Sequence, residues 1–337
     1  MKRSIFCLFL VAALMVTFLI GQGYAKTYKW RIQSAFSRGD FSADLLPSFA
    51  EEVKKKSNGR LVLTTFYAGD LVPTEDTLTA TTRGMIEMSQ GCGALWQGVE
   101  PILGLVAGAP FMYKGTLQEV ETLIEKTGLY AQFEAAYDRQ QCHLLGIHTY
   151  GPYPAIVSNK PIRTINDFKG LKVRAILANA DLMKELGAAP GYIPGGEIYM
   201  ALKLGTFDAA TYSIDAIRGF KWHEVIKYYL LPYWTDYYFG EIIVNKKAWN
   251  SLPPDLQKIL EEAMVNYGNA NKEIYEKEKQ AILDMQKELG YEVITLSDAD
   301  VEIIRKIALE KIWPNEAKKN DELGKAYKSI MKYLGIQ

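Results

Sequence analysis

The sequence predicts an α/β protein with two similar lobes and a long helix that crosses both of them. Three observations support this prediction. Strand-like and helix-like segments alternate along the chain, which is typical of helices packed on sheets of parallel strands. The alternation occurs in two successive units, which indicates two lobes. A long helical stretch with a polar middle follows these units, as expected for a helix that bridges two bodies.

The first unit follows an apolar run at the N-terminus. Residues 42–56 have the apolar spacing of an amphipathic helix, and residues 74–84 resemble a helix that ends at a glycine. Strands are expected at 28–34, 60–67 and 86–91. In parallel layers the strand C-termini and the loops after them line a ligand crevice. By this rule the residues expected to face the crevice are Phe36 after the first strand, Gln90 after the third, and Trp96 in the next loop.

The second unit repeats the alternation. Strands are expected at 142–149, 155–158, 171–175 and 207–212. The segment "TINDF" opens a short helix, Asn179 is expected to cap a helix over 180–186, and another helix spans 197–204. No sequence repeat relates the two units, so the prediction of two lobes rests on the order of the elements.

The long helix follows a further strand-like stretch at 238–245. Pro253 and Pro254 suit the first turn of a helix, and an apolar stripe runs from Leu256 to Met264. Residues 267–279 are poorer in apolar side chains, as expected where a helix passes between two cores. Two more helical segments close the chain and are expected to pack back on a lobe.

The N-terminus has the pattern of a signal peptide. Lys2 and Arg3 precede an apolar run over 5–20, and the small residues Gly23 and Ala25 suit cleavage after Ala25. An uncleaved membrane anchor is the alternative, because the run approaches the roughly 17 residues that span a bilayer. Cleavage of residues 1–25 from the 337 would leave 312, a length that favours two domains, and would make this an exported protein.

The charged and sulfur-containing residues exclude several classes of function. Without Lys2 and Arg3 the chain carries 39 acidic and 37 basic residues, interleaved throughout, which is unlike a nucleic-acid-binding surface. The three histidines are scattered and form no metal or nucleophile motif, and no cofactor is expected. Cys92 and Cys142 are compatible with a disulfide or with two buried free thiols, because spacing alone does not show their separation.

Arg174 is the candidate binding residue that the sequence marks most clearly. It ends the apolar strand-like stretch "LKVRA" and is followed by Ala175, Ile176 and Leu177. A guanidinium stays charged and is costly to bury alone. Arg174 therefore either extends to solvent, pairs inside the protein, or binds an anion.

Several motifs resemble the extracytoplasmic solute-binding proteins of tripartite ATP-independent periplasmic (TRAP) transporters, the dicarboxylate-binding-protein (DctP) family. The most specific is the block from "SNKPIRTINDFKGLKVRA" to "KELGAAPGYIPGGEIYMALKLGTFDAA" at 158–210. The other matching pieces are "FAEEVKKKSNGRL" at 49–61, "AGDLVPTEDTLTATTRGMIEMSQG" at 68–91, "APF" at 109–111 and "VNKKAWNSLPPDLQKILEEA" at 244–263. The pieces cover most of the chain in the family's order. "LVPTED" and "YYLLPYWTDYYFGEIIVN" are most similar to the subgroup that binds 2-oxo acids and other monocarboxylates.

The resemblance implies two α/β lobes that close on a ligand as a clamp, with a long helix running across both. Lobe I is expected to comprise residues 26–150 and about 237–276, and lobe II residues 151–236 and about 277–337. In the family the arginine that ends the "GLKVR"-type strand forms a salt bridge with the ligand carboxylate, and Arg174 occupies that place. Two parallel N–H donors suit a carboxylate.

Other ligand contacts follow from the same resemblance. Tyr212 stands where the family has a contacting residue, Trp234 lies in a segment that crosses between lobes, and Tyr153 is either a contact or hinge packing. Relatives that bind a 2-oxo acid with a metal ion have an acidic residue and a tryptophan where this chain has Thr211 and Tyr212. This departure argues against a metal site, for which only Asp215 is a candidate.

The expected function is the capture of a small organic carboxylate and its delivery to the integral-membrane TRAP permease. One positive anchor among aromatic residues favours a monocarboxylate, such as a 2-oxo or 2-hydroxy acid or one with an aromatic body. A second arginine, Arg38 or Arg218, would suit a C4-dicarboxylate instead. An exported hydrolase lacks support, since no G-x-S-x-G elbow or metal motif is present. A ligand-sensing module with the same fold is a further alternative.

Overall fold

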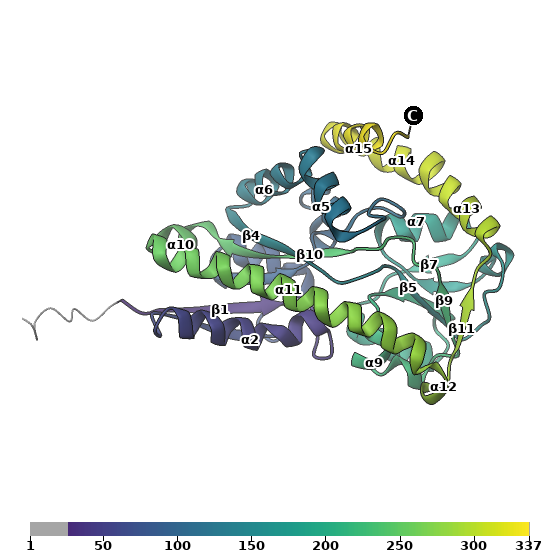
Figure 1. Cartoon of the computed structure of the whole chain (residues 1–337), viewed down its shortest axis with the longest axis horizontal. Coiled ribbons are helices and arrows are strands. Elements are labelled where there is room, and N and C mark those ends of the chain that lie inside the picture. The colour runs from purple at the N-terminus through teal and green to yellow at the C-terminus, as the bar shows by residue number, and fades with distance from the viewer. Residues whose placement is uncertain (1–25, 337) are drawn as a thin grey trace, which may run out of the picture.

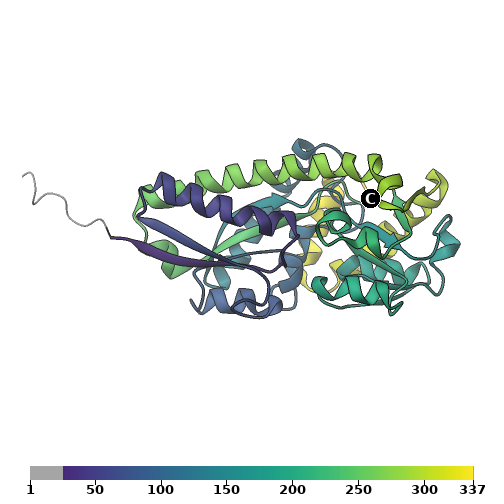
Figure 2. The ribbon, with the colours of Figure 1, turned by 90° about the horizontal axis from the view of Figure 1, so that it is seen from below.

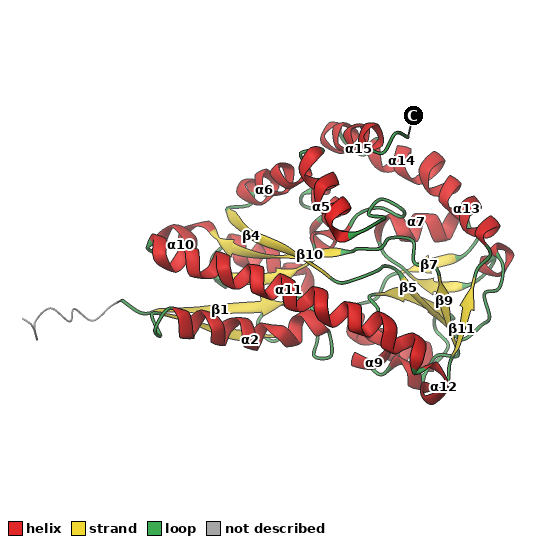
Figure 3. Cartoon of the chain, viewed as in Figure 1, coloured by secondary structure: helices red, strands yellow, loops and turns green. Residues whose placement is uncertain are grey.

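The computed structural model describes residues 26–336, and the signal peptide expected at residues 1–25 lies outside this range. Two sheets with helices around them form two lobes that lie end to end (Figure 1). Figure 3 shows the strands of each sheet enclosed by helices. Within residues 26–336, no helix has the length and apolar character needed to cross a bilayer.

The first sheet has five strands in the order β2-β1-β3-β10-β4. Its strands are β1 (Tyr28–Ser34), β2 (Leu61–Phe66), β3 (Met88–Gly91), β4 (Cys142–Thr149) and β10 (Phe239–Asn245). The pairs β1–β2 and β1–β3 are parallel, but β10 runs antiparallel to both β3 and β4. The prediction of parallel pairing is therefore wrong for β10, because this strand enters the sheet on its return from the second lobe.

The second sheet has six strands in the order β11-β9-β5-β8-β6-β7. Its strands are β5 (Ala155–Ser158), β6 (Lys172–Arg174), β7 (Ala189–Gly191), β8 (Ala209–Tyr212), β9 (Tyr228–Leu231) and β11 (Glu292–Thr295). Here β5 is the antiparallel strand, because it enters from the first lobe and runs against β8 and β9. Parallel pairing holds for β6 with β7 and β8, and for β9 with β11.

The helices cover both sheets and join them. They are α2 (Phe41–Lys56), α3 (Thr77–Thr82), α4 (Gly104–Ala107), α5 (Leu117–Lys126), α6 (Leu129–Arg139), α7 (Leu177–Glu185), α8 (Ile198–Lys203), α9 (Ala216–Gly219), α10 (Lys246–Ser251), α11 (Pro254–Asp284), α12 (Gln286–Leu289), α13 (Asp298–Ile307), α14 (Trp313–Ala317) and α15 (Asp321–Tyr333). The prediction that Asn179 caps α7 is wrong. The helix begins two residues earlier, at Leu177, and Asn179 is buried within it.

The 31-residue helix α11 lies along both lobes, as Figure 2 shows. Its first half packs in one core with α2 and the first sheet, through residues such as Leu260 and Tyr267. Its second half contributes Tyr275 and Ile282 to the core around the second sheet. The polar middle that the sequence shows is therefore the part of the helix that passes from one core to the other.

Two antiparallel segments connect the lobes beside this helix. Residues 150–154 lead from β4 to β5, and residues 232–238 lead from β9 back to β10. Backbone hydrogen bonds join the two segments, including Tyr153 N to Thr235 O (3.0 Å) and Tyr238 N to Gly151 O (2.9 Å). These bonds make the two segments a short antiparallel ladder between the lobes.

Candidate functional site

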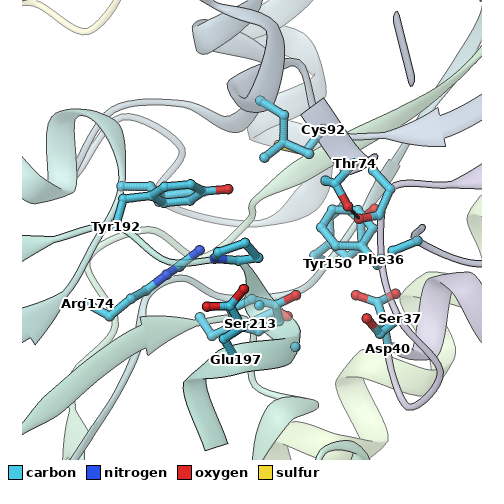
Figure 4. Close-up of a pocket in the computed structure, with 18 of the residues that line it drawn as sticks. Phe36, Ser37, Asp40, Thr74, Cys92, Tyr150, Arg174, Tyr192, Glu197 and Ser213 are labelled. Carbon is cyan, nitrogen blue, oxygen red and sulfur yellow. Dashed lines mark hydrogen bonds between the residues drawn. The ribbon is translucent and has the colours of Figure 1, made fainter. Parts of the chain in front are cut away.

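A cavity of about 280 Å³ lies between the two sheets, where strands from both lobes end. Its walls come from the loops after β1, β2 and β3, from the connecting segments, and from the ends of β6, β7 and β8. The lining residues are Ala35, Phe36, Ser37, Asp40, Ala68, Gly69, Thr74, Cys92, Leu95, Tyr150, Tyr153, Arg174, Ile176, Tyr192, Pro194, Gly195, Gly196, Glu197, Tyr212, Ser213 and Tyr238. This is the strand-end crevice that an α/β protein offers to a ligand (Figure 4).

Arg174 lies at the carboxyl end of β6, between β7 and β8, and is only 4% exposed. Its Nε donates to the carbonyl of Ile193 (3.2 Å), and Nη1 donates to the carbonyl of Thr211 (3.0 Å). No ion pair among residues 26–336 includes Arg174. Protein acceptors thus use two of the five guanidinium N–H groups and leave the positive charge without a carboxylate.

Aromatic rings surround this charge. The guanidinium carbon of Arg174 lies 5.5 Å from the ring of Tyr192 and 5.6 Å from that of Tyr212. Tyr153 and Tyr238 stack on each other with ring centroids 4.2 Å apart. Rings next to a guanidinium hold it in place and exclude water, which strengthens its attraction for an anion.

Buried carboxyl groups lie at the other side of the cavity. Asp40 caps α2, where its Oδ1 accepts a hydrogen bond from Ala43 N (2.9 Å). Asp215 lies behind the wall and accepts from Phe41 N (2.9 Å) and from the Tyr275 hydroxyl (3.0 Å). Burial raises the pKa of Asp215 to about 6. Burial, together with the nearby charge of Asp215, raises the pKa of Asp40 well above its ordinary range.

The cavity brings together four of the seven residues expected to bind a ligand: Phe36, Tyr153, Arg174 and Tyr212. Gln90 is fully buried behind the wall, where its Nε2 donates to the Tyr150 hydroxyl and its Oε1 accepts from the Ser34 hydroxyl. Its effect on the cavity is to hold Tyr150 in position.

The two tryptophans expected to contact the ligand lie in cores instead. Trp96 is 1% exposed and packs edge-on against Tyr137. Trp234 is 1% exposed and stacks on Phe111. Neither is among the residues that line the cavity, because a large indole after a strand gains more by filling the core than by facing a wet crevice.

Several cavity residues were not expected from the sequence, notably Asp40, Tyr192, Glu197, Ser213 and Tyr238. Ser213 directly follows β8, so the strand-end rule could have found it. Asp40 is the N-cap of α2, and it also lines the cavity. Cys92, another lining residue, is a free thiol, as is the buried Cys142, so the two do not form a disulfide.

The two lobes touch each other around the cavity. The Tyr192 hydroxyl of the second lobe donates to Glu75 of the first (2.9 Å). On the other side the backbones of Gly39 and Gly219 meet so closely that a Cβ at Gly219 would lie 2.0 Å from Gly39 O. Only glycine fits there, and the contact indicates that the lobes are in a closed arrangement.

The comparison with models of protein families shows the family to which this chain belongs. The model of the bacterial extracellular solute-binding protein family 7 (DctP) matches residues 34–320. The chain belongs to this family. Family 7 comprises binding proteins rather than enzymes, so the expectation of a non-enzymatic TRAP solute-binding protein is confirmed.

Two curated binding proteins are similar to this chain. The chain is 27% identical over 251 residues to the 2,3-diketo-L-gulonate-binding periplasmic protein of Escherichia coli, which covers 73% of this chain and 75% of that protein. It is 29% identical over 241 residues to a monocarboxylate 2-oxoacid-binding periplasmic protein of Nostoc. That match covers 70% of this chain but 65% of the relative, slightly less than two thirds of its length.

Solved structures confirm the two-lobed clamp. A TRAP periplasmic solute-binding protein from Pseudoalteromonas atlantica with bound sodium and pyruvate has a TM-score of 0.82 at 25% identity, covering 91% of this chain and 94% of that one. A Rhodobacter sphaeroides protein described as an apo open structure has a TM-score of 0.70 at 25% identity, covering 91% and 98%. The lower score for the open form agrees with the lobe contacts seen here.

Proposed function

We propose that this family 7 protein is the periplasmic component of a TRAP transporter and captures a small organic monocarboxylate for delivery to a membrane permease. The ligand class is a 2-oxo or 2-hydroxy acid, or a monocarboxylate with an aromatic body. The observation that carries the proposal is Arg174, a buried arginine at the cavity wall with no carboxylate partner among residues 26–336. A ligand carboxylate would complete its hydrogen bonds.

A single anchor favours a monocarboxylate over the C4-dicarboxylate alternative. Arg218 is occupied by Glu278, to which its Nε donates (2.8 Å), and Arg38 lies over the ring of Tyr67. Neither residue lines the cavity. The names of the E. coli and Nostoc relatives, and the pyruvate bound in the P. atlantica structure, support the same ligand class.

Closure of the lobes would enclose the bound ligand before it is delivered to the permease. Lobe I, proposed as residues 26–150 with 237–276, supplies Phe36 to the cavity, and lobe II, proposed as 151–236 with 277–337, supplies Arg174 and Tyr212. A ligand that contacts both lobes stabilises the closed form relative to the open one. Trp234, Gln90 and Trp96 would then act from behind the wall, through the residues that they pack against.

Thermal-shift screening against mono- and dicarboxylates tests the proposal. A ligand present at 100 times its dissociation constant adds about 2.7 kcal/mol to the free energy of unfolding, which is easily seen in a melting curve. We expect monocarboxylates to shift the melting temperature of the parent protein and not that of the Arg174→Ala variant. A panel in which no carboxylate stabilises the parent would refute the proposal.

A further inference from the structure

The far wall of the cavity holds a buried polar group with an unused hydrogen-bonding atom. Asp40 is 1% exposed and lines the cavity. Its Oδ1 caps α2, but its Oδ2 has no hydrogen-bond partner among residues 26–336. A buried carboxylate oxygen without a partner carries a large desolvation cost, so such an atom requires an explanation.

The structure supplies partners to both carboxyl oxygens of the neighbouring acid but to only one oxygen of Asp40. Asp215 accepts hydrogen bonds from Phe41 N, the Ser213 hydroxyl and the Tyr275 hydroxyl, so both of its oxygens are satisfied. The cap of α2 needs only one oxygen of Asp40. The second oxygen of Asp40 therefore has no partner among residues 26–336, although Asp40 lines the cavity.

Asp40 and Arg174 lie on opposite sides of the cavity (Figure 4). They also come from different lobes, since Asp40 precedes α2 and Arg174 ends β6. The rings of Phe36 and Tyr150, which meet at 5.3 Å, lie on the Asp40 side and supply no second cation there. Arg174 thus places a positive charge on one side of the cavity, and Asp40 places a carboxyl group on the other.

We propose that Asp40 binds the ligand through Oδ2, and that the ligand carries a hydrogen-bond donor, a hydroxyl or an ammonium group, at the end away from its carboxylate. The inference rests on the proposed function, because it takes the carboxylate to be held by Arg174. A ligand with both groups would bridge the two lobes, since each end is bound by a different one. An unsubstituted carboxylate would leave the Asp40 oxygen buried without a partner.

The test uses straight-chain carboxylates of increasing length, each as the unsubstituted acid, the ω-hydroxy acid and the ω-amino acid. Binding is measured by calorimetric titration of the full chain. For at least one length, we expect the substituted acid to bind the parent roughly tenfold or more tightly than the unsubstituted one, because the unsubstituted acid leaves a buried oxygen without a hydrogen-bond partner. Whether the hydroxy or the amino series shows the gain identifies the donor.

Asp40→Ser and Asp40→Asn test the residue itself. Serine and asparagine cap helices about as well as aspartate, so both variants keep the start of α2, and either suffices if the other fails to fold. We expect both variants to lose the preference for the substituted acid. The substituted acid should bind them more weakly than it binds the parent, and the unsubstituted acid, which leaves the Asp40 oxygen without a partner in the parent, should bind them at least as tightly. Asp44→Asn is the matched control, because Asp44 is exposed, lies one turn further along α2 and does not line the cavity.

The outcomes separate this inference from the proposed function. Equal or tighter binding of the unsubstituted acid at every length, or a preference that survives in Asp40→Ser, would overturn the role of Asp40 and leave carboxylate binding intact. If no acid of any series bound the parent, the proposed function would fail and the inference with it. Arg174→Ala should weaken the binding of all three kinds of acid alike.

Discussion

Replacing Arg174 tests the proposed anchor most directly. In Arg174→Ala the ligand carboxylate enters a largely dry cavity without its cation, which should cost about 2 to 5 kcal/mol of binding free energy. This corresponds to roughly 30-fold to several-thousandfold weaker binding. Arg174→Lys keeps the charge but offers no planar pair of donors, so it should also bind measurably more weakly than the parent.

The structure also indicates how much Arg174→Ala should lower the free energy of unfolding. Arg174 donates to the carbonyls of Ile193 and Thr211, and the alanine variant leaves both carbonyls without this donor. A lost hydrogen bond to a buried acceptor costs about 1 to 3 kcal/mol. The alanine variant should therefore melt at a lower temperature than the parent but still fold, because the cavity admits water when the lobes open.

Calorimetric titration with a ligand from the screen, together with a melting curve without ligand, separates the two effects. Arg163→Ala serves as the control, because Arg163 is exposed in the same lobe, pairs with Glu292 and does not line the cavity. Parent-like affinity in Arg174→Ala, or its complete failure to fold, would show that Arg174 is a structural arginine and would refute the reasoning.

Three further predictions concern export, closure and pH. N-terminal sequencing of exported protein should begin at Lys26, whereas a mature form that retains residues 5–20 would indicate a membrane anchor. Small-angle scattering should give a smaller radius of gyration with saturating ligand, and an unchanged profile would count against the clamp. Burial raises the pKa of Asp215 from its ordinary 3.8 to about 6, so the folded protein binds this proton more tightly than the unfolded chain. This contribution to the free energy of unfolding is complete below the unfolded-state pKa of 3.8 and is lost as the pH rises through the folded-state pKa of about 6. Asp215→Asn should make this decline smaller in urea melts at a series of pH values, with the raised pKa of Asp40 accounting for the remainder, and an identical decline in both proteins would contradict the assignment.

The sequence predicted the cavity best where backbone position alone decides where a residue lies. Arg174 and Tyr212 end strands β6 and β8, and Phe36 follows β1, so the strand-end rule brings all three to one crevice. The same rule did not place Trp96 correctly, and the resemblance did not place Trp234 correctly, because neither takes account of side-chain size. Their indoles fill the core around Tyr137 and Phe111.

Features that depend on contacts between distant parts of the chain could not be predicted from the sequence. Nothing local in β5 or β10 shows that the chain reverses direction when it crosses between lobes. Asp40 was not predicted from the sequence, and only the packed lobes show that one of its carboxyl oxygens has no partner. Helices α5 and α6 were not predicted, although Thr116 and Glu119 form the capping box that marks the start of α5.

The order of strands in the first sheet bears on how the protein is made. Strand β10 lies inside that sheet, where Val244 pairs with Met88 on one side and His143 on the other, yet the whole second sheet up to β9 is synthesised before it. The first sheet therefore lacks an inner strand until most of the chain has left the ribosome. Pairings so distant in sequence form slowly, because a long loop must close before any contact is gained. The first lobe therefore cannot complete its sheet during most of translation, and its folding has to wait until the strands of the second lobe up to β9 have been made.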